Sequence, residues 1–214
     1  MRGVYILHGA RGSGSSIVEA ACAEIGAHYR VEDLRLKDDE QRDGRYAALN
    51  PQRKVPTLEV EGGEIITESV AILLTLDERH REAGLLPPPA SKERAHALRW
   101  LLFLATEMYP LIEIVDYPGR FVPAGGDEPG VRERAKEIWR TRWLLVERHI
   151  TGSPYFSASG FSVVDLYVAT LSRWDLAAEW RREHLPNVEA LTAAVRARPA
   201  LVPVFARHFP PPAV

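Results

Sequence analysis

Cysteine, long apolar runs and surplus charge are all scarce in this chain of 214 residues. Cys22 is the only cysteine, so no disulfide can form within the chain, which fits a reducing compartment such as the cytoplasm. A formal net charge of −2 gives no electrostatic reason to expect a nucleic acid or a membrane surface as partner. The longest apolar runs, such as 100–105, are much shorter than the roughly 20 residues of a membrane-spanning helix.

The sequence also lacks a cluster of metal-ligating residues and an export signal. The seven histidines are scattered and none has zinc-ligand spacing to the cysteine, so we expect no metal site. The apolar start of the chain turns into the glycine-rich stretch 9–16 too early for a signal peptide. We therefore expect a cytoplasmic protein without a resident metal.

The first eighty residues mix strand and helix patterns. The polar stretch 37–52 has no clear periodicity, and Gly62-Gly63 accepts the positive φ angles of a tight hairpin turn. The sequence predicts strands at 3–8, 29–36, 57–60 and 64–67, and helices at 17–25 and 69–79. This order, β-α-β-loop-β-β-α, is close to the thioredoxin arrangement.

The character of the chain changes near residue 85. Three consecutive prolines at 87–89 cannot continue a helix, and almost every pattern after Ser91 is helical. We predict an α/β thioredoxin-like domain over 1–80, a linker over 81–90 and an all-helical domain over 91–214. The proline stretch can also be a loop inside one domain, but the change of secondary-structure type favours two domains.

Two features of the segment 53–69 suggest a binding site. A cis peptide bond before Pro56 would turn the backbone N–H and C=O of Val55 outward, where an extended peptide can pair with them. A trans proline that starts an edge strand explains the same pattern equally well. Glu68-Ser69 opens a helix, where the free N–H groups suit a carboxylate and the Glu68 side chain suits an ammonium group. The alternative is a simple helix cap.

The same residues carry a family resemblance. N-P-x-x-K-V-P-T-L at 50–58, followed by E-S-V-A-I at 68–72, resembles the N-terminal domain of the glutathione transferase family, and nearly the whole chain fits that family. The resemblance implies a homodimer in which Pro56 is cis and the Val55 backbone pairs with the cysteinyl unit of glutathione. It also implies that Glu68 and Ser69 hold the γ-glutamyl head. Lys54 would then approach the glycine carboxylate, with Arg53 as a substitute.

A second motif agrees with this resemblance. Ser162 and Asp165 have the spacing of a capping box, with Phe161 and Leu166 placed to close the turn. A similar box starts a buried helix in the helical domain of these transferases, so we expect Asp165 to be structural. The family usually has a glycine four residues before the capping residue, and Ala158 stands there in this chain.

The chemistry implied by the family is activation of a thiol. A free thiol has a pKa near 8.5, and lowering it by about two units needs roughly 2.7 kcal/mol of preferential stabilisation of the thiolate. Hydroxyl groups at the start of the first helix can supply it, and the candidates are Ser13, then Ser15. The family's usual serine or cysteine position falls on Gly12, so backbone N–H groups of this loop are the alternative. Ser16 is a plain helix cap and Cys22 is buried packing.

A second substrate would be a small hydrophobic electrophile. Residues 108–121 combine aromatic side chains with prolines that must bend or end a helix. The wall residues that we expect in the electrophile pocket are Met108, Tyr109, Tyr117 and Phe121. An aromatic stripe is more often core than pocket, and the five tryptophans are assigned to helix packing.

Other functions fit the sequence less well. The loop after the first strand has neither nucleotide-binding glycine spacing nor a nucleophile elbow, which argues against a dinucleotide enzyme and a serine hydrolase. We therefore predict a glutathione S-transferase with glutathione as co-substrate. The alternatives are a non-catalytic binding protein of this fold, or a glutathione-dependent peroxidase or disulfide reductase.

Overall fold

The computed structural model describes residues 4–174 and 176–210, which form two compact units. Unit 1 contains the described residues of 1–86 and of 196–214, and unit 2 contains those of 87–195. Residues 196–210 are therefore part of the first unit, whereas the sequence assigns them to the helical domain. Leu85 and Leu86, which the sequence assigns to a linker, are buried in unit 1.

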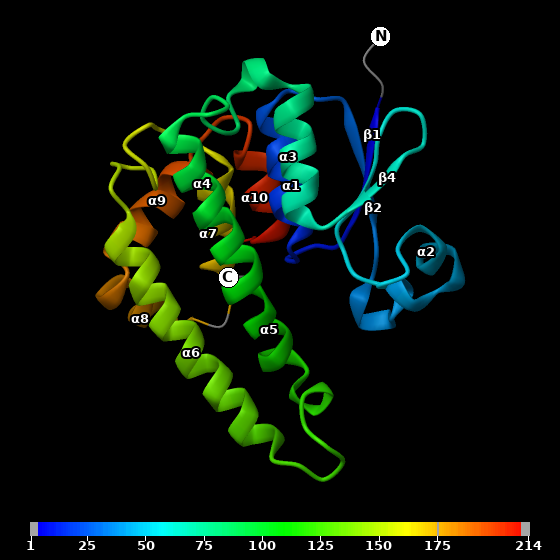
Figure 1. Cartoon of the computed structure of the whole chain (residues 1–214). Coiled ribbons are helices and arrows are strands. Elements are labelled where there is room, and N and C mark those ends of the chain that lie inside the picture. Colours follow the sequence, from blue (N-terminus) through cyan, green and yellow to red (C-terminus); the bar gives the residue numbers. More distant parts are fainter. Residues whose placement is uncertain (1–3, 175, 211–214) are drawn as a thin grey trace. The chain divides into compact units, whose positions relative to one another are not determined.

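Unit 1 is built on a four-stranded sheet with the strand order β2-β1-β3-β4 (Figure 1). The strands are β1 (Tyr5–Gly9), β2 (Tyr29–Asp33), β3 (Thr57–Glu59) and β4 (Ile65–Thr67). β1 is parallel to β2 and antiparallel to β3, and β3 is antiparallel to β4. His8 lies opposite Thr57, which lies opposite Thr67, so the end of β1, the start of β3 and the end of β4 share one edge of the sheet.

Helices lie on both faces of this sheet (Figure 1). They are α1 (Ser15–Glu24), α2 (Gly44–Leu49), α3 (Ser69–Arg79) and α10 (Val202–His208), with the short turns η1 (Leu36–Asp38), η2 (Glu40–Arg42) and η3 (Arg81–Ala83). α1 packs against α3, β1 and α10, whereas Tyr46 of α2 lies beside His8 on the other face. Leu7, Ile17 and Leu73 have no exposed surface and form the core between the sheet and α1 and α3.

The thioredoxin-like order of elements predicted for this part of the chain is confirmed. The predicted first strand starts at residue 3, which lies outside the described residues, and β2 ends at Asp33 rather than at residue 36. Helix α2 was missed, because the sequence predicts only a polar loop over 37–52. Tyr46 is its only buried residue, so α2 leaves no apolar periodicity in the sequence.

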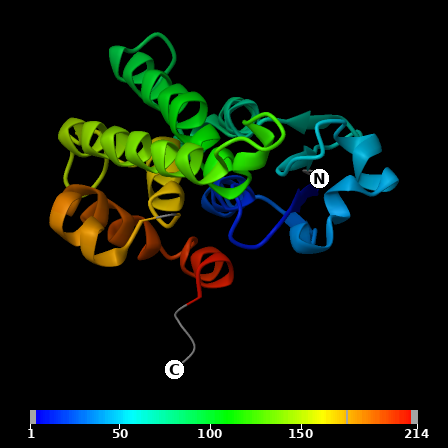
Figure 2. The same cartoon turned by 90° about the horizontal axis from the view of Figure 1, so that it is seen from below.

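All regular elements among the described residues of unit 2 are helical, as the sequence predicts. They are α4 (Lys92–Leu102), the π-helical segment η4 (Phe103–Met108), α5 (Tyr109–Asp116), η5 (Pro118–Arg120), α6 (Glu128–His149), α7 (Val163–Leu171), α8 (Ala178–His184) and α9 (Pro186–Arg196). α6 lies beside α5 (Figures 1 and 2). Across the described ranges, no helix combines the length and the apolar character needed to cross a membrane.

Helix α7 is buried along its whole length and begins with the predicted capping box. The two carboxylate oxygens of Asp165 accept hydrogen bonds from the backbone N–H groups of Phe156 at 2.7 Å and of Ser162 at 2.8 Å. Burial raises the pKa of Asp165 to about 6, although these hydrogen bonds act in the opposite direction. All of these contacts hold the start of α7 in place, which fits the expected structural role.

Candidate functional site

Three segments of unit 1 meet at one edge of the sheet because of the strand register. The loop 10–14 follows β1, the segment 53–56 precedes β3, and Glu68-Ser69 follows β4. Because His8, Thr57 and Thr67 lie side by side, the segments attached to them leave the sheet at the same edge. This edge therefore collects all the sequence-predicted thiol-activating and glutathione-binding residues. Their roles remain predictions.

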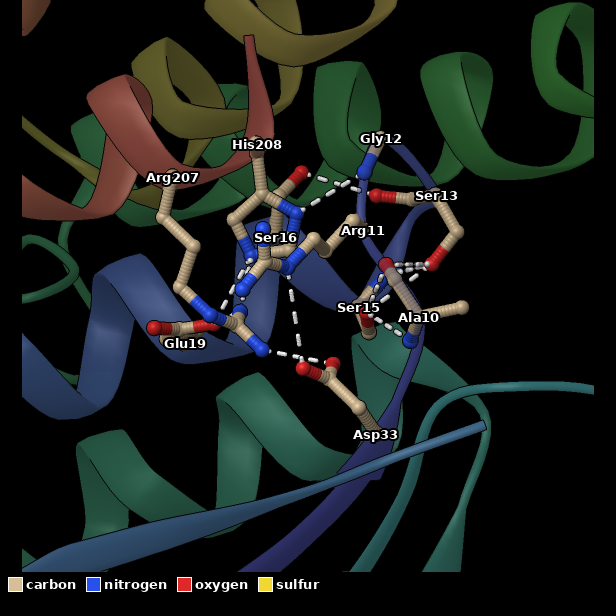
Figure 3. A network of polar contacts seen from close by, with 10 residues as sticks. All are labelled: Ala10, Arg11, Gly12, Ser13, Ser15, Ser16, Glu19, Asp33, Arg207 and His208. Carbon is tan, nitrogen blue, oxygen red and sulfur yellow. Dashed lines mark hydrogen bonds and ion pairs between the residues drawn. The ribbon is translucent and has the colours of Figure 1, made fainter. Parts of the chain in front are cut away.

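The loop 10–14 is held by a compact hydroxyl network (Figure 3). The Ser13 hydroxyl donates to the carbonyl oxygen of Ala10 at 2.7 Å, and the Ser15 hydroxyl lies 3.0 Å from the same oxygen. The two hydroxyl oxygens are 2.9 Å apart, and Ser15 Oγ also accepts the Ala10 N–H at 3.0 Å. Ser16 is separate from this arrangement, since its hydroxyl donates to the Ser13 carbonyl at 2.9 Å.

Each serine hydroxyl has one proton, which limits what this network can do. When Ser13 donates to Ala10, the proton of Ser15 points to Ser13 Oγ, and neither proton is left for a ligand. If the Ser13 proton turns to a ligand, the Ser15 proton can replace it on the Ala10 carbonyl, which lies within reach. The Ala10 carbonyl also accepts the Ser13 backbone N–H at 3.2 Å, so the pair can release one hydroxyl donor without leaving this buried carbonyl unpaired.

Two glycines allow the loop to take this shape. A Cβ atom on Gly9 would lie 2.6 Å from Ser15 Cβ, so only glycine permits α1 to begin this close to β1. Gly12 has a φ of +71°, in the left-handed region that glycine adopts without steric strain. The family's usual serine or cysteine position therefore has a backbone that favours glycine in this protein.

Backbone donors at this loop can also bind an anion. Within the described residues, the N–H of Gly14 makes no hydrogen bond, and Gly14 directly precedes helix α1. The first turn of α1 contains no acidic residue to oppose the positive potential of the helix N-terminus. A thiolate at this position could therefore be stabilised by the backbone as well as by Ser13.

The segment before β3 is held in place by two side chains to which the sequence analysis gave no role. The Tyr46 hydroxyl and the Asn50 amide both donate to the Lys54 carbonyl at 2.7 Å, and both contact the hydroxyl of Thr57. No hydrogen bond to the backbone of Val55 is found within the described ranges, and the peptide bond that follows Val55 is cis. The N–H and C=O of Val55 are thus available to an extended ligand.

The start of α3 presents an acid and a hydroxyl. Glu68 precedes the helix with a φ of +64°, is exposed, and makes no capping hydrogen bond with its side chain. Ser69 is the first helical residue and is buried, and the first turn of α3 contains no acid. A non-glycine residue at positive φ is costly and is often found at binding sites. The Glu68 side chain therefore does not cap α3, and its role as a ligand group stays a prediction.

The remaining predicted contacts on glutathione come from two cations. Arg53 and Lys54 are exposed, and Arg53 also has a positive φ, of 57°. Lys54 directly precedes Val55 and Arg53 precedes Lys54, so both side chains leave the chain close to the open backbone of Val55. They can contribute a positive charge for a carboxylate at this end of the site.

The four predicted electrophile-pocket residues lie in unit 2 and differ in exposure. Met108 has no exposed surface, and the ring of Tyr109 packs against that of Trp174 with 5.1 Å between centroids. Tyr117 and Phe121 are about half exposed, and the Arg120 guanidinium covers the Tyr117 ring at 4.0 Å. The predicted interruption of the helix is present, because the π-helical segment η4 ends just before Pro110.

Sequence patterns gave no sign of the long-range contact at this site. His208 of α10 accepts a hydrogen bond at Nδ1 from the Gly12 N–H, at 3.1 Å. A separation of 196 residues leaves no periodic or motif signal for such a pair. Tyr46 was missed for a related reason, whereas Asn50 stands in the motif that carries the family resemblance.

Two other kinds of site are not formed by the described residues. Cys22 is completely buried, and this burial raises the pKa of its thiol to about 12. Among residues 4–174 and 176–210, no group of three or more His, Cys, Asp or Glu side chains is placed to hold a metal ion.

Comparisons with known proteins agree with this arrangement. A family model described as "Glutathione S-transferase, N-terminal domain" matches residues 15–79. The uncharacterized GST-like protein YncG of Escherichia coli (strain K12) is 30% identical over 204 residues, which cover 94% of this chain and 97% of YncG.

Solved structures give the same result. A glutathione transferase homolog from Sulfitobacter, solved with bound glutathione, has a TM-score of 0.85 at 22% identity and covers 94% of this chain and 96% of its own. A sphingomonad glutathione S-transferase complexed with glutathione has a TM-score of 0.78 at 25% identity, over 93% of this chain and 96% of its own. With YncG matched over nearly its whole length, this chain belongs to the glutathione S-transferase family.

Proposed function

We propose that this protein is a glutathione transferase that binds glutathione in unit 1, activates its thiol and adds it to a small hydrophobic electrophile. The observation that carries the proposal is the single sheet edge at which three segments expose groups suited to the tripeptide. These are the start of α1, the Val55 backbone and Glu68 before α3. The sphingomonad enzyme, which has a similar fold and was solved with glutathione, supports the same assignment.

Each part of glutathione has a chemically matched partner in this proposal. The cysteinyl unit pairs as a short strand with the N–H and C=O of Val55. The γ-glutamyl carboxylate lies at the N-terminus of α3 with Ser69, and its ammonium group lies against Glu68. Lys54 or Arg53 receives the glycine carboxylate. The homodimer and the electrophile pocket at residues 108–121 remain expectations from the family resemblance.

Thiol activation follows from the serine pair. The Ser13 proton turns from the Ala10 carbonyl to the sulfur, the Ser15 proton takes its place on Ala10, and the Gly14 N–H adds a second donor. Hydrogen bonds to the thiolate and the nearby helix N-terminus favour the ionised form, so the thiol pKa falls. The thiolate then attacks the electrophile.

The test is glutathione affinity, measured by calorimetry on the wild type, Glu68→Ala and Glu78→Ala. Glu78 is an exposed acid near the other end of α3, so its loss changes the net charge equally without touching the proposed head-group site. We expect Glu68→Ala to lose affinity by about tenfold or more, since a charge-assisted hydrogen bond contributes about 1.5–3 kcal/mol. Glu78→Ala should bind like the wild type.

Equal affinity in the two variants would remove Glu68 from the site, and a wild type that binds no glutathione would end the proposal. Binding of S-methylglutathione tests the contribution of the γ-glutamyl head group independently of the thiol. This analogue should bind the wild type and lose the same factor with Glu68→Ala, because the methyl group leaves the γ-glutamyl end unchanged.

One observation favours a second candidate, a non-catalytic binding protein. Both serine protons are used within the loop when it holds no ligand, so a loop too rigid to release one would bind glutathione without activating it. Glutathione binding with no conjugation of a generic aryl halide, and with an unshifted thiol pKa, would select this candidate.

A further inference from the structure

His208 is a buried residue near the end of the chain that reaches the proposed thiol site. Its side chain is 1% exposed, and its ring lies between the loop 10–14 and Glu19 of helix α1 (Figure 3). Nδ1 lies 3.1 Å from the Gly12 nitrogen, and Nε2 lies 2.7 Å from Glu19 Oε2. The His208 ring therefore links helix α10 to Gly12 on one side of Ser13 and Ser15 and to Glu19 on the other.

These two contacts define the tautomer of the ring. A backbone N–H can only donate, so Nδ1 accepts from Gly12 and carries no proton. Nε2 then carries the proton and donates to the Glu19 carboxylate. Arg207 Nη1 is 3.0 Å from Nε2, but two N–H donors cannot bond each other, so Arg207 acts through its ion pairs with Glu19 and Asp33.

The contact at Gly12 affects the orientation of the next residue. Gly12 has a positive φ and is joined directly to Ser13, so the direction of its N–H influences where the Ser13 hydroxyl points. The hydrogen bonds that Ser13 and Ser15 make with Ala10 are local and turn with the loop. His208 is anchored elsewhere, on α10 and α1, so it can hold the loop against the rest of unit 1.

We propose that His208 is a positioning residue for thiol activation, which rests on the function proposed above. Its neutral imidazole holds the Gly12 N–H through Nδ1 and thereby keeps Ser13 and the Gly14 N–H directed at the sulfur. Glu19 and Arg207 hold the imidazole in the required tautomer and orientation. His208 itself does not touch the sulfur in this proposal.

Two substitutions separate the two nitrogens of the ring. His208→Asn places an amide oxygen near the position of Nδ1, where it can accept from Gly12, but it cannot reach Glu19. His208→Gln places an amide nitrogen near the position of Nε2, where it can donate to Glu19, but it offers Gly12 no acceptor. His96→Gln, at an exposed position on α4, is the matched control.

The proposal predicts that one variant changes the thiol pKa and the other changes the thermal unfolding temperature. His208→Gln should keep the thermal unfolding temperature close to the wild type, yet raise the pKa of the bound glutathione thiol by about one unit, which lowers kcat about threefold at pH 7 and by up to about tenfold at lower pH. His208→Asn should unfold at a lower temperature because Glu19 loses the hydrogen bond from His208 and keeps only its ion pair with Arg207, yet it should keep the wild-type thiol pKa. The thiol is titrated by the ultraviolet absorbance of the thiolate in glutathione-saturated protein, and KM for glutathione should change little in either variant.

A purely structural His208 would give the opposite order, with activity following stability, and that result would overturn the proposal. An unchanged thiol pKa in His208→Gln would overturn it as well. Amide hydrogen exchange at Gly12 provides a readout that needs no glutathione, and it should speed up in His208→Gln and not in His208→Asn. If Gly12 responds in this way but the wild type binds no glutathione, the proposed function has failed and the hydrogen bond itself stands.

Discussion

At the scale of single residues, the Ala10 carbonyl is an acceptor that two hydroxyl groups share. Ser13 Oγ lies 2.7 Å from it and Ser15 Oγ lies 3.0 Å from it. The carbonyl also accepts the Ser13 backbone N–H at 3.2 Å, so it stays paired when the Ser13 hydroxyl turns away, and the Ser15 hydroxyl can restore the hydrogen bond that is lost. The value of Ser15 in the proposed chemistry is therefore as a replacement for Ser13.

This arrangement predicts unequal effects of the two serine substitutions. Ser13→Ala removes the donor to the sulfur and should raise the pH midpoint of turnover by about one unit. Ser15→Ala removes the replacement donor and the acceptor of the Ala10 N–H, but no group that contacts the sulfur, and should give a smaller rise in the same direction. The measurement is kcat against pH with saturating glutathione. The exposed Ser159 in unit 2 provides the control variant Ser159→Ala.

An unchanged pH profile in Ser13→Ala would assign the sulfur to the Gly14 N–H and the other backbone groups of this loop. A larger shift in Ser15→Ala than in Ser13→Ala would contradict the exchange of donors and make Ser15 the direct contact.

The candidate site could be predicted from the sequence only where its residues are close together in the chain. Glu68 and Ser69 stand at the start of a helix that the apolar pattern predicts. Ser13 lies just before another predicted helix, and Ser15 is its first residue in the structure. His208 could not be predicted, because its contribution is a contact with Gly12 that only the folded chain creates.

At the scale of secondary-structure elements, helices with a buried apolar stripe were predictable and α2 was not. Helix α3 buries Ile72, Leu73 and Leu76 on one face, which gives the 3.6-residue period in the sequence. Helix α2 buries only Tyr46, whose hydroxyl holds the segment before β3. A helix whose main task is to place one hydroxyl group leaves no such period.

The capping box of α7 makes a pH prediction about stability. Asp165 has a pKa of about 6 in the fold against 3.8 as the ordinary value. Between about pH 4 and pH 6 the unfolded chain therefore gives up this proton while the folded chain keeps it, and the free energy of unfolding falls as pH rises. Two units of pKa correspond to about 3 kcal/mol across this window.

Asp165→Asn provides the comparison, because the amide does not titrate. The free energy of unfolding, measured in denaturant at several pH values, should fall more steeply from pH 4 to pH 6 in the wild type than in the variant. At pH 4 the variant should still be less stable. The two oxygens of Asp165 each accept a backbone N–H, and in the asparagine variant the amide NH2 group, which can only donate, replaces one of these oxygens. Parallel pH curves would contradict the raised pKa.

At the scale of the whole molecule, the chain returns to its first unit after completing the second. Helix α10 packs against α1 and buries Leu201, Val204 and Phe205 in unit 1. The sequence did not indicate this return, because a helix near the end of a helical region looks the same whichever unit it joins. The division of elements between units depends on contacts between distant residues.

Phe205→Ala tests this assignment of α10. Phe205 is 2% exposed, and its truncation should lower the free energy of unfolding by about 3–5 kcal/mol. Hydrogen exchange read segment by segment should show the loss of protection in α1, the element of unit 1 against which α10 packs. Leu145→Ala removes a partly exposed apolar side chain of α6 and serves as the control. A loss of protection confined to unit 2 would contradict the assignment.

The lone sulfhydryl of the chain has a practical consequence. Cys22 is enclosed on every side and stays protonated far above neutral pH, so the folded protein carries no competing thiolate of its own. Reagents that react only with thiols should leave the polypeptide unmodified. A colorimetric thiol reagent added to an assay should therefore count only the free tripeptide that remains, without a background from the protein.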